Sequence, residues 1–249
     1  MHNLFYQVFT PLLAAHFLGD FIFQTDNDIK NKSRTTVFTK HILLVTGLSY
    51  ILTGFWNYLI IPIVILLSHT VIDLLKRLFK KDSLAVFLTD QVAHIIIIFF
   101  LTVYMQNVFI KYNLSDSFWL NIFGSGYYQT IIIITAIVLS TKFCSIIISY
   151  IIKPYQSKIF INEKNDNGSI NTGRLIGYLE RLIILVLFIT DLPVMVGFLI
   201  TAKSILRYGE IKNEKDKLMI EYVLIGTLLS FTLGISIAFI ASKAIVNMN

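Results

Sequence analysis

The sequence has few of the charged residues that a soluble globular domain requires. Only 14% of its 249 residues are charged, whereas 55% are hydrophobic, and soluble domains contain about 25% charged residues. Several apolar runs reach the length of about 18 residues that indicates a membrane-spanning helix. These runs are continuous rather than alternating, which excludes the pattern of a transmembrane barrel. We therefore predict an all-α, polytopic transmembrane bundle of six to seven spans.

Cysteine is almost absent, and no targeting feature precedes the first apolar run. The one cysteine, Cys144, excludes an internal disulfide. The first apolar run lacks a basic segment before it, so we expect it to be retained rather than cleaved. The net charge of +6 comes mainly from short loops between apolar runs. We therefore expect membrane lipid around the chain and no nucleic-acid partner, and we leave open a small-molecule or lipid substrate and the oligomeric state.

The apolar runs predict helices over residues 3–24, 37–57, 58–79, 84–110, 128–152 and 219–241. Basic residues mark the loops after the first and third of these helices: Lys30, Lys32, Arg34, Lys76, Arg77, Lys80 and Lys81. By the positive-inside rule, both loops are cytoplasmic and the N-terminus lies outside. The abundance of Ile, Lys and Asn suggests an AT-rich bacterial genome, and we predict a multi-pass protein of the bacterial cytoplasmic membrane.

The sequence divides into four regions. Residues 1–110 form a four-helix unit, 111–152 a connecting loop with a fifth helix, 153–173 a polar cytoplasmic linker, and 174–249 a C-terminal membrane unit. The apolar stretch 174–202 contains Pro193, which can kink or break a span. A single span and a re-entrant hairpin are both open for this stretch.

Polar residues recur at one level of the first four predicted helices. Each of these helices carries one histidine, and three of the histidines have an aspartate four residues away, on the same helix face. In an up-and-down bundle the helix ends that carry them all lie on the side of the basic loops. We therefore expect seven groups to converge just inside the cytoplasmic face: His16, Asp20, His41, His69, Asp73, Asp90 and His94.

The spacing of these residues indicates an internal repeat. His16 and His41 are 25 residues apart, as are His69 and His94, and 53 residues separate the two pairs. We interpret this pattern as two repeated helical hairpins with the same orientation and a site at their interface. Asp90 breaks the symmetry because Val37 is its counterpart, so we expect a separate role for it.

Imidazole and carboxylate side chains together predict a metal site. They are ligands of zinc, manganese, iron and nickel, and a divalent ion offsets the cost of burying carboxylates. Two copies of a His-Asp-His pattern suit two ions about 3.5–4 Å apart. We expect zinc, with manganese or iron as alternatives. The alternative role for some of the aspartates is to orient a ligating histidine. A hydrogen-bonded network that only fixes helix packing is the structural alternative.

Asp90, one of the seven groups, and two further polar residues in these helices have predicted roles in catalysis or substrate binding. Asp90 is the candidate general base, or a bridge between metals. Gln24 and Gln91 are candidates for binding a water molecule or substrate, although an interhelical hydrogen bond explains them equally well. The counterpart of Gln24 in the second hairpin is Arg77.

Four sequence segments resemble a known family. The segments "HFLGDFIFQ", "KH" at 40–41, "SHTVIDLLK" and "DQVAH" are similar to the bacterial membrane family called domain of unknown function 3307. That family is marked by an HFLGD and a DQ-x-x-H element, here residues 16–20 and 90–94. The resemblance covers about the first 110 residues, and the tail looks like that of longer members. It implies no activity, and the likeness to membrane-bound metal-dependent hydrolases is only an analogy.

Basic residues of the C-terminal region are candidates for binding an anionic substrate. Arg174, Arg181, Lys203 and Arg207 lie near predicted helix ends. They either mark topology and snorkel to the interface or form an anion site above the metals. Glu180 and Glu221 are the expected salt-bridge partners of these cations.

Three functions are consistent with these features. The first is a membrane-embedded, metal-dependent hydrolase of a phosphoester or amide, with the metals activating water. The second is a carrier or channel for a divalent cation or proton, which the scarcity of polar residues in the outer halves of the first four helices weakens. The third is a non-enzymatic membrane partner with a structural His/Asp network.

Overall fold

The computed structural model describes residues 4–25, 28, 34–79, 83–112, 117–159, 167–208 and 217–248, with side chains of 156–171 and 206–221 left out. Helices and turns account for the described residues, and no strand occurs among them, which confirms the all-α prediction. The chain splits into two compact units. The first unit comprises Met1–Val138 with Ala244–Asn249, and the second comprises Leu139–Lys243.

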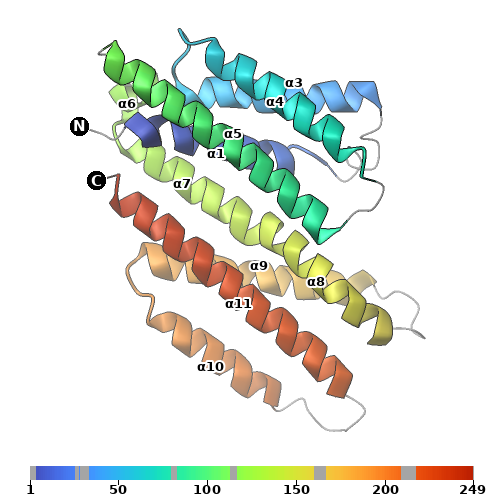
Figure 1. Cartoon of the computed structure of the whole chain (residues 1–249). Coiled ribbons are helices and arrows are strands. Elements are labelled where there is room, and N and C mark those ends of the chain that lie inside the picture. Colours follow the sequence, from blue (N-terminus) through green and yellow to red (C-terminus); the bar gives the residue numbers. More distant parts are fainter. Residues whose placement is uncertain are drawn as a thin grey trace. The chain divides into compact units, whose positions relative to one another are not determined.

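The first unit is built on four helices: α1 (Leu4–Phe21), α3 (Thr35–Thr53), α4 (Ile60–Lys76) and α5 (Leu84–Lys111). Each packs against the next in chain order, and α5 closes the ring against α1 (Figure 1). The short α6 (Phe118–Phe123) and the longer α7 (Gly126–Val138) follow, and α7 packs on α1. This ring brings the ends of four helices together around one interior.

The ends of these helices follow from local chemistry. Gly54 ends α3 in the left-handed conformation with φ 68°, which glycine adopts without the strain that a side chain would add. A Cβ at this position would lie 2.7 Å from the ring of Trp119, so the site also requires the absence of a side chain. At the start of α5, Ser83 caps the helix by accepting a hydrogen bond from the Val86 amide at 3.3 Å.

An apolar core fills one half of this four-helix unit. Val8, Leu12, Ile61 and Met105 have no exposed surface, and they pack with further buried residues of α3 to α5. These core residues precede the histidines in α1 and α4 and follow them in α5. Buried apolar side chains therefore close one side of the region that contains the histidines.

The second unit contains a π-helical turn η1 (Leu139–Phe143), α8 (Cys144–Ile159), α9 (Asn167–Ile189), α10 (Met195–Tyr208) and most of α11 (Lys217–Val246). A turn that includes Pro193 separates α9 from α10. Lys203 of α10 and Glu180 of α9 form an ion pair at 2.6 Å, so the two helices pack as a hairpin (Figure 1). The stretch 174–202 is thus two helices rather than one continuous helix.

Within the described ranges, four helical segments are long and apolar enough to cross a membrane: Thr35–Thr53, Leu84–Lys111, Gly126–Tyr155 and Tyr222–Val246. Six to seven spans were predicted, and the described residues do not confirm that number. Helix α4 is only 17 residues long, which is short for a span. Helix α1 has 18 residues, but polar side chains and Pro11 lower its hydropathy.

Two predicted loops differ from the structure. Helices α8 and α9 together cover most of the predicted linker 153–173, because α8 continues through Pro154 to Ile159 and α9 begins at Asn167. The predicted connection 111–127 contains the helical turn α6, whose N-cap Ser117 accepts a hydrogen bond from the Leu120 amide. Short polar segments were interpreted as loops because composition alone does not reveal such caps.

Candidate metal centre

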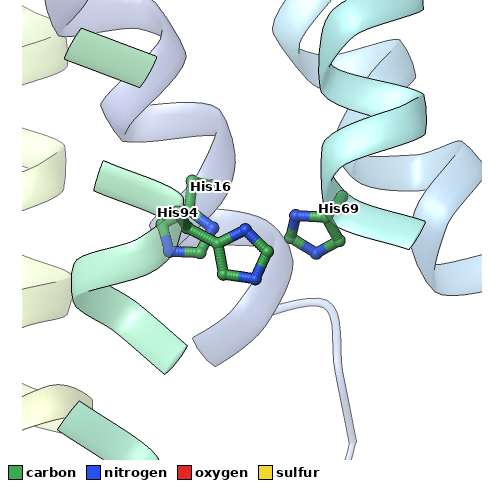
Figure 2. A group of neighbouring side chains, drawn as sticks. All are labelled: His16, His69 and His94. Carbon is green, nitrogen blue, oxygen red and sulfur yellow. The ribbon is translucent and has the colours of Figure 1, made fainter. Parts of the chain in front are cut away.

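Four histidines from four helices converge inside the first unit. All four are buried. The ring of His94 lies 4.1 Å from that of His69 and 4.7 Å from that of His16, measured between centroids. Figure 2 shows these three imidazoles pointing toward one another. His41 completes the group, with its ring 5.1 Å from that of His69. The structure therefore confirms that the four histidines share one level.

A glycine in α1 allows this convergence. Gly19 lies one turn from His16 and faces α3, where a Cβ on Gly19 would come within 2.4 Å of Val45 Cγ2. Small residues of this kind let helix backbones approach closely. The close contact of α1 with α3 brings Asp20 within reach of His41, and it gives the glycine of the HFLGD segment a structural role.

Three ligand atoms form a compact triangle. Asp20 Oδ1 lies 3.4 Å from His41 Nε2 and 3.7 Å from His69 Nε2, and the two nitrogens are 3.1 Å apart. Donors on one tetrahedral zinc ion lie about 3.3 Å from one another, because each is about 2.0–2.1 Å from the metal. Asp20, His41 and His69 therefore have the spacing of three ligands of a single ion, and we call them the metal triangle.

Two other groups in the cluster bring ligand atoms within 4.8 Å of one another. The first is His16, His69 and His94, and the second is Asp73, Asp90 and His94. His69 and His94 each belong to more than one group, so the groups form one connected cluster. All seven residues predicted as ligands belong to it.

Several buried polar atoms in the cluster have no hydrogen-bond partner in the part of the chain that the structure describes, although His–Asp contacts of 3.4–3.9 Å occur among them. They are both ring nitrogens of His16, Asp20 Oδ1, Asp90 Oδ1, Gln91 Oε1 and His94 Nε2. More than about 90% of buried polar groups in proteins have a partner, and an unsatisfied one costs about 1–3 kcal/mol. Unpaired imidazole nitrogens and carboxylate oxygens at one place are the donor set of a divalent transition metal, so the residues present fit such an ion.

A lysine that was read as a loop marker is part of the cluster. Lys76 Nζ donates a hydrogen bond to Asp90 Oδ2 at 2.6 Å. The Lys76 side chain is 31% exposed, whereas the Asp90 side chain is 3% exposed. Lys76 lies three residues after Asp73, so the two residues are neighbours on the surface of one helix. The three-residue spacing from Asp73 could have predicted that Lys76 lies near the cluster, but Lys76 was assigned to a loop.

Gln91 connects the metal triangle with the Lys76–Asp90 pair. Its Nε2 donates to Asp20 Oδ2 at 3.1 Å and to Asp90 Oδ2 at 3.3 Å. One amide nitrogen thus joins the carboxylate of the triangle and the candidate general base. Gln24, the other predicted substrate ligand, is half-buried, and its Nε2 has no hydrogen-bond partner among the described residues.

A small cavity lies beside the histidines. Its volume is about 10 Å³, and His16, His69 and His94 line it together with Ser49 and Ser68. A space of this size holds about one water molecule. The remaining lining residues are apolar, among them Leu12, Ile65 and Ile98. The cavity therefore gives the histidine nitrogens room for one small occupant.

The basic residues predicted to bind substrate belong to the second unit, whereas the His/Asp cluster belongs to the first unit. Arg174 is exposed. Arg181 is buried and donates to the Ser140 carbonyl oxygen and, at 2.6 Å, to the Ser230 hydroxyl. Lys203 pairs with Glu180, as predicted for that glutamate. The side chains of Arg207 and Glu221 lie outside the described residues.

Comparisons with known proteins agree with the resemblance seen in the sequence. A family described as "Protein of unknown function (DUF3307)" matches residues 8–121. Comparisons with curated proteins and with solved structures gave no match. The matched segment begins within α1, contains α3, α4 and α5, and ends within α6. The entire His/Asp cluster therefore lies in the segment that is similar to the DUF3307 family.

Proposed function

We propose that the first unit binds a divalent transition metal and acts as a metal-dependent hydrolase of a phosphoester or amide at one face of a bacterial cytoplasmic membrane. The observation that carries the proposal is the metal triangle, whose three ligand atoms are separated by 3.1, 3.4 and 3.7 Å. Two histidines and one carboxylate are the ligands of hydrolytic zinc sites that keep a fourth position for water or substrate. The same set suits iron or manganese.

Residues around the triangle supply the other parts of a hydrolytic site. When bound, the metal polarises the scissile group and lowers the pKa of its water. Asp90 is the candidate proton acceptor through Oδ1, because its other oxygen is held by Lys76 and Gln91. A general base must lie within hydrogen-bond reach of the proton that it removes, so this role requires the water or substrate to bind beside Oδ1.

Exposure of the cluster supports access from one side. Asp20 is 13% exposed and Lys76 is 31% exposed, and both lie at the helix ends that lead into the basic loops. On the opposite side, the cluster meets buried Leu12, Ile65 and Ile98. A transport site needs a route to both faces of the membrane, so the buried apolar side chains on this side of the cluster favour hydrolysis over transport.

The unpaired polar atoms argue against a purely structural network. A network that serves only helix packing satisfies its members, because each unpaired buried group is costly. Here neither ring nitrogen of His16 has a hydrogen-bond partner among the described residues, and its nearest charged neighbour is Asp20 Oδ1, 3.9 Å from Nδ1. Ligand binding explains this arrangement better than helix packing alone.

Metal analysis and hydrolysis assays together test the proposal. Purified protein is expected to contain stoichiometric transition metal by mass spectrometry, and Asp20→Asn and His69→Ala are expected to lose most of it. Detergent-solubilised protein should cleave p-nitrophenyl phosphate or a peptide p-nitroanilide, and chelator should abolish the cleavage.

Control measurements separate the alternatives. His2→Ala also removes one histidine, but it changes a position outside the predicted cluster, so its metal content should equal that of the wild type. Unchanged metal content in His69→Ala would overturn the metal site. Metal binding without hydrolysis, combined with proteoliposome flux that disappears in Asp73→Asn, would replace hydrolysis with transport.

A further inference from the structure

We propose that the ammonium group of Lys76 takes the place of a second metal ion, so that the cluster holds one divalent ion rather than two. This inference rests on the proposed metal binding and specifies its stoichiometry. The ion belongs to the triangle of Asp20, His41 and His69. The lysine neutralises Asp90 in the neighbouring group that also contains Asp73 and His94.

The Lys76 ammonium lies beside the Asp90 carboxylate, which a second metal ion in the group of Asp73, Asp90 and His94 would need as a ligand. Lys76 Nζ lies 2.6 Å from Asp90 Oδ2, the length of a strong charge-assisted hydrogen bond. The same oxygen accepts a hydrogen bond from Gln91 at 3.3 Å. A second divalent ion on this carboxylate would stand close to the ammonium, and like charges at such a distance repel strongly in a buried site.

Charge balance supports the same stoichiometry. With neutral histidines, the three aspartates of the cluster and Lys76 sum to a charge of −2, which one divalent ion neutralises. A second ion would leave an excess of +2 in a buried environment, where uncompensated charge is costly. Without Lys76 the charge is −3, and a second ion becomes acceptable.

The predicted repeat places both partners of this ion pair in one half only. With the offset of 53 residues, Lys76 corresponds to Phe23 and Asp90 to Val37. The pair Asp20 and His41 in the first hairpin corresponds to Asp73 and His94 in the second. The first hairpin therefore supplies two ligands of the metal triangle. In the second hairpin, the carboxylate of Asp90, which has no counterpart in the first, pairs with the ammonium of Lys76, which also has none.

Counting metal ions in matched variants tests the inference. We expect one ion per chain in the wild type and about two in Lys76→Met, which keeps the length of the side chain and removes its charge. Lys76→Arg should stay at one ion. Lys40→Met is the matched control, because Lys40 is 61% exposed and pairs with Asp28 at 3.6 Å; it should also stay at one ion.

Asp90→Asn provides a second test that does not depend on how well Lys76→Met folds. If Asp90 is not a ligand, this variant should keep one ion with a Kd within about threefold of the wild type, whereas Asp20→Asn should lose it. Any one of three results would overturn this inference without overturning the proposed function: loss of the ion in Asp90→Asn, two ions in the wild type, or one ion in Lys76→Met. A wild-type chain without stoichiometric metal would overturn the proposed function as well.

Discussion

The Nε2 atoms of His41 and His69 lie 3.1 Å apart, although the two residues belong to different halves of the predicted repeat. Two neutral imidazoles at this distance share a hydrogen bond only if one of them donates. A metal ion instead takes a lone pair from both nitrogens. The contact between α3 and α4 at this point therefore depends on whether an ion is bound.

Metal removal should lower the stability of the first unit. An ion that bridges α1, α3 and α4 stabilises the folded state by about 2.7 kcal/mol when its concentration is 100 times the Kd. We expect chelator to lower the Tm of the wild type in detergent and added zinc to restore it. His41→Ala should show a low Tm that responds to neither reagent.

Ser49→Ala is the control for this measurement, because Ser49 lines the cavity but is not among the ligand groups. Its Tm should respond to chelator and zinc as that of the wild type does. Equal responses in His41→Ala and Ser49→Ala would contradict the assignment of His41 as a ligand.

Close packing of α1 on α3 should make Gly19 sensitive to any side chain. In Gly19→Ala the new Cβ would meet Val45 Cγ2 at 2.4 Å, and overpacking of this kind costs about 1–3 kcal/mol. The helices would separate and move Asp20 away from His41, so we expect a lower Tm and a lower metal content. Thermal unfolding and metal analysis on the same sample measure both effects.

Two variants isolate the cause in this experiment. Gly47→Ala adds a Cβ with nothing within 4 Å and should leave Tm and metal content unchanged or slightly raise the Tm, since alanine favours helix. Gly19→Ala combined with Val45→Ala removes the clash and should recover part of the metal content. No recovery in the double variant would show that Gly19 acts through something other than contact with Val45.

The sequence predicted the members of the cluster because helix periodicity and helix ends determine which residues share a level. His16 and Asp20 are one turn apart, and so are His69 and Asp73, so an approximate helix boundary was enough to bring them together. The seven predicted ligands all lie in the connected groups for this reason.

Finer features depend on atomic contacts that periodicity does not encode. Which three residues come closest is decided by how near α1 approaches α3 at Gly19, and this distance is set by packing. Lys76 was assigned to a loop because charge at a helix end normally marks topology. Its long side chain turns back to Asp90, and only the structure reveals that direction.

Arg181 shows the same limitation in the second unit. The sequence made it a candidate for binding anions, whereas the structure places it inside the unit with Ser140 and Ser230 as acceptors. Two glycines make room for it, since a Cβ on Gly177 would lie 3.1 Å from its Nη1 and one on Gly234 would lie 3.0 Å from its Cγ. These acceptors and glycines lie in η1, α9 and α11, and no spacing rule in the sequence links these three elements.

Packing around Arg181 predicts that Gly234→Ala destabilises the second unit. The new Cβ would press on the Arg181 stem, which cannot withdraw easily because its guanidinium is hydrogen-bonded to Ser230 and Ser140. We expect a loss of about 1–3 kcal/mol, measured by denaturant unfolding in detergent. Gly197→Ala, with nothing within 4 Å of its Cβ, should be close to neutral. Metal content should stay at the wild-type level in both variants, and a loss in Gly234→Ala would show that the cluster depends on the second unit.

The orientation of the cluster can be tested with single cysteines in a Cys144→Ser background, since Cys144 is the only native thiol. Arg34 and Phe79 are exposed next to the ends of α3 and α4 that carry the cluster, and Trp56 is exposed in the turn at their opposite ends. The positive-inside rule predicts that Arg34→Cys and Phe79→Cys react with an impermeant maleimide only after the membrane is permeabilised, whereas Trp56→Cys reacts in intact spheroplasts. The reverse pattern would place the open side of the cluster outside, and a hydrolase of this architecture would then require a substrate that reaches the outer face.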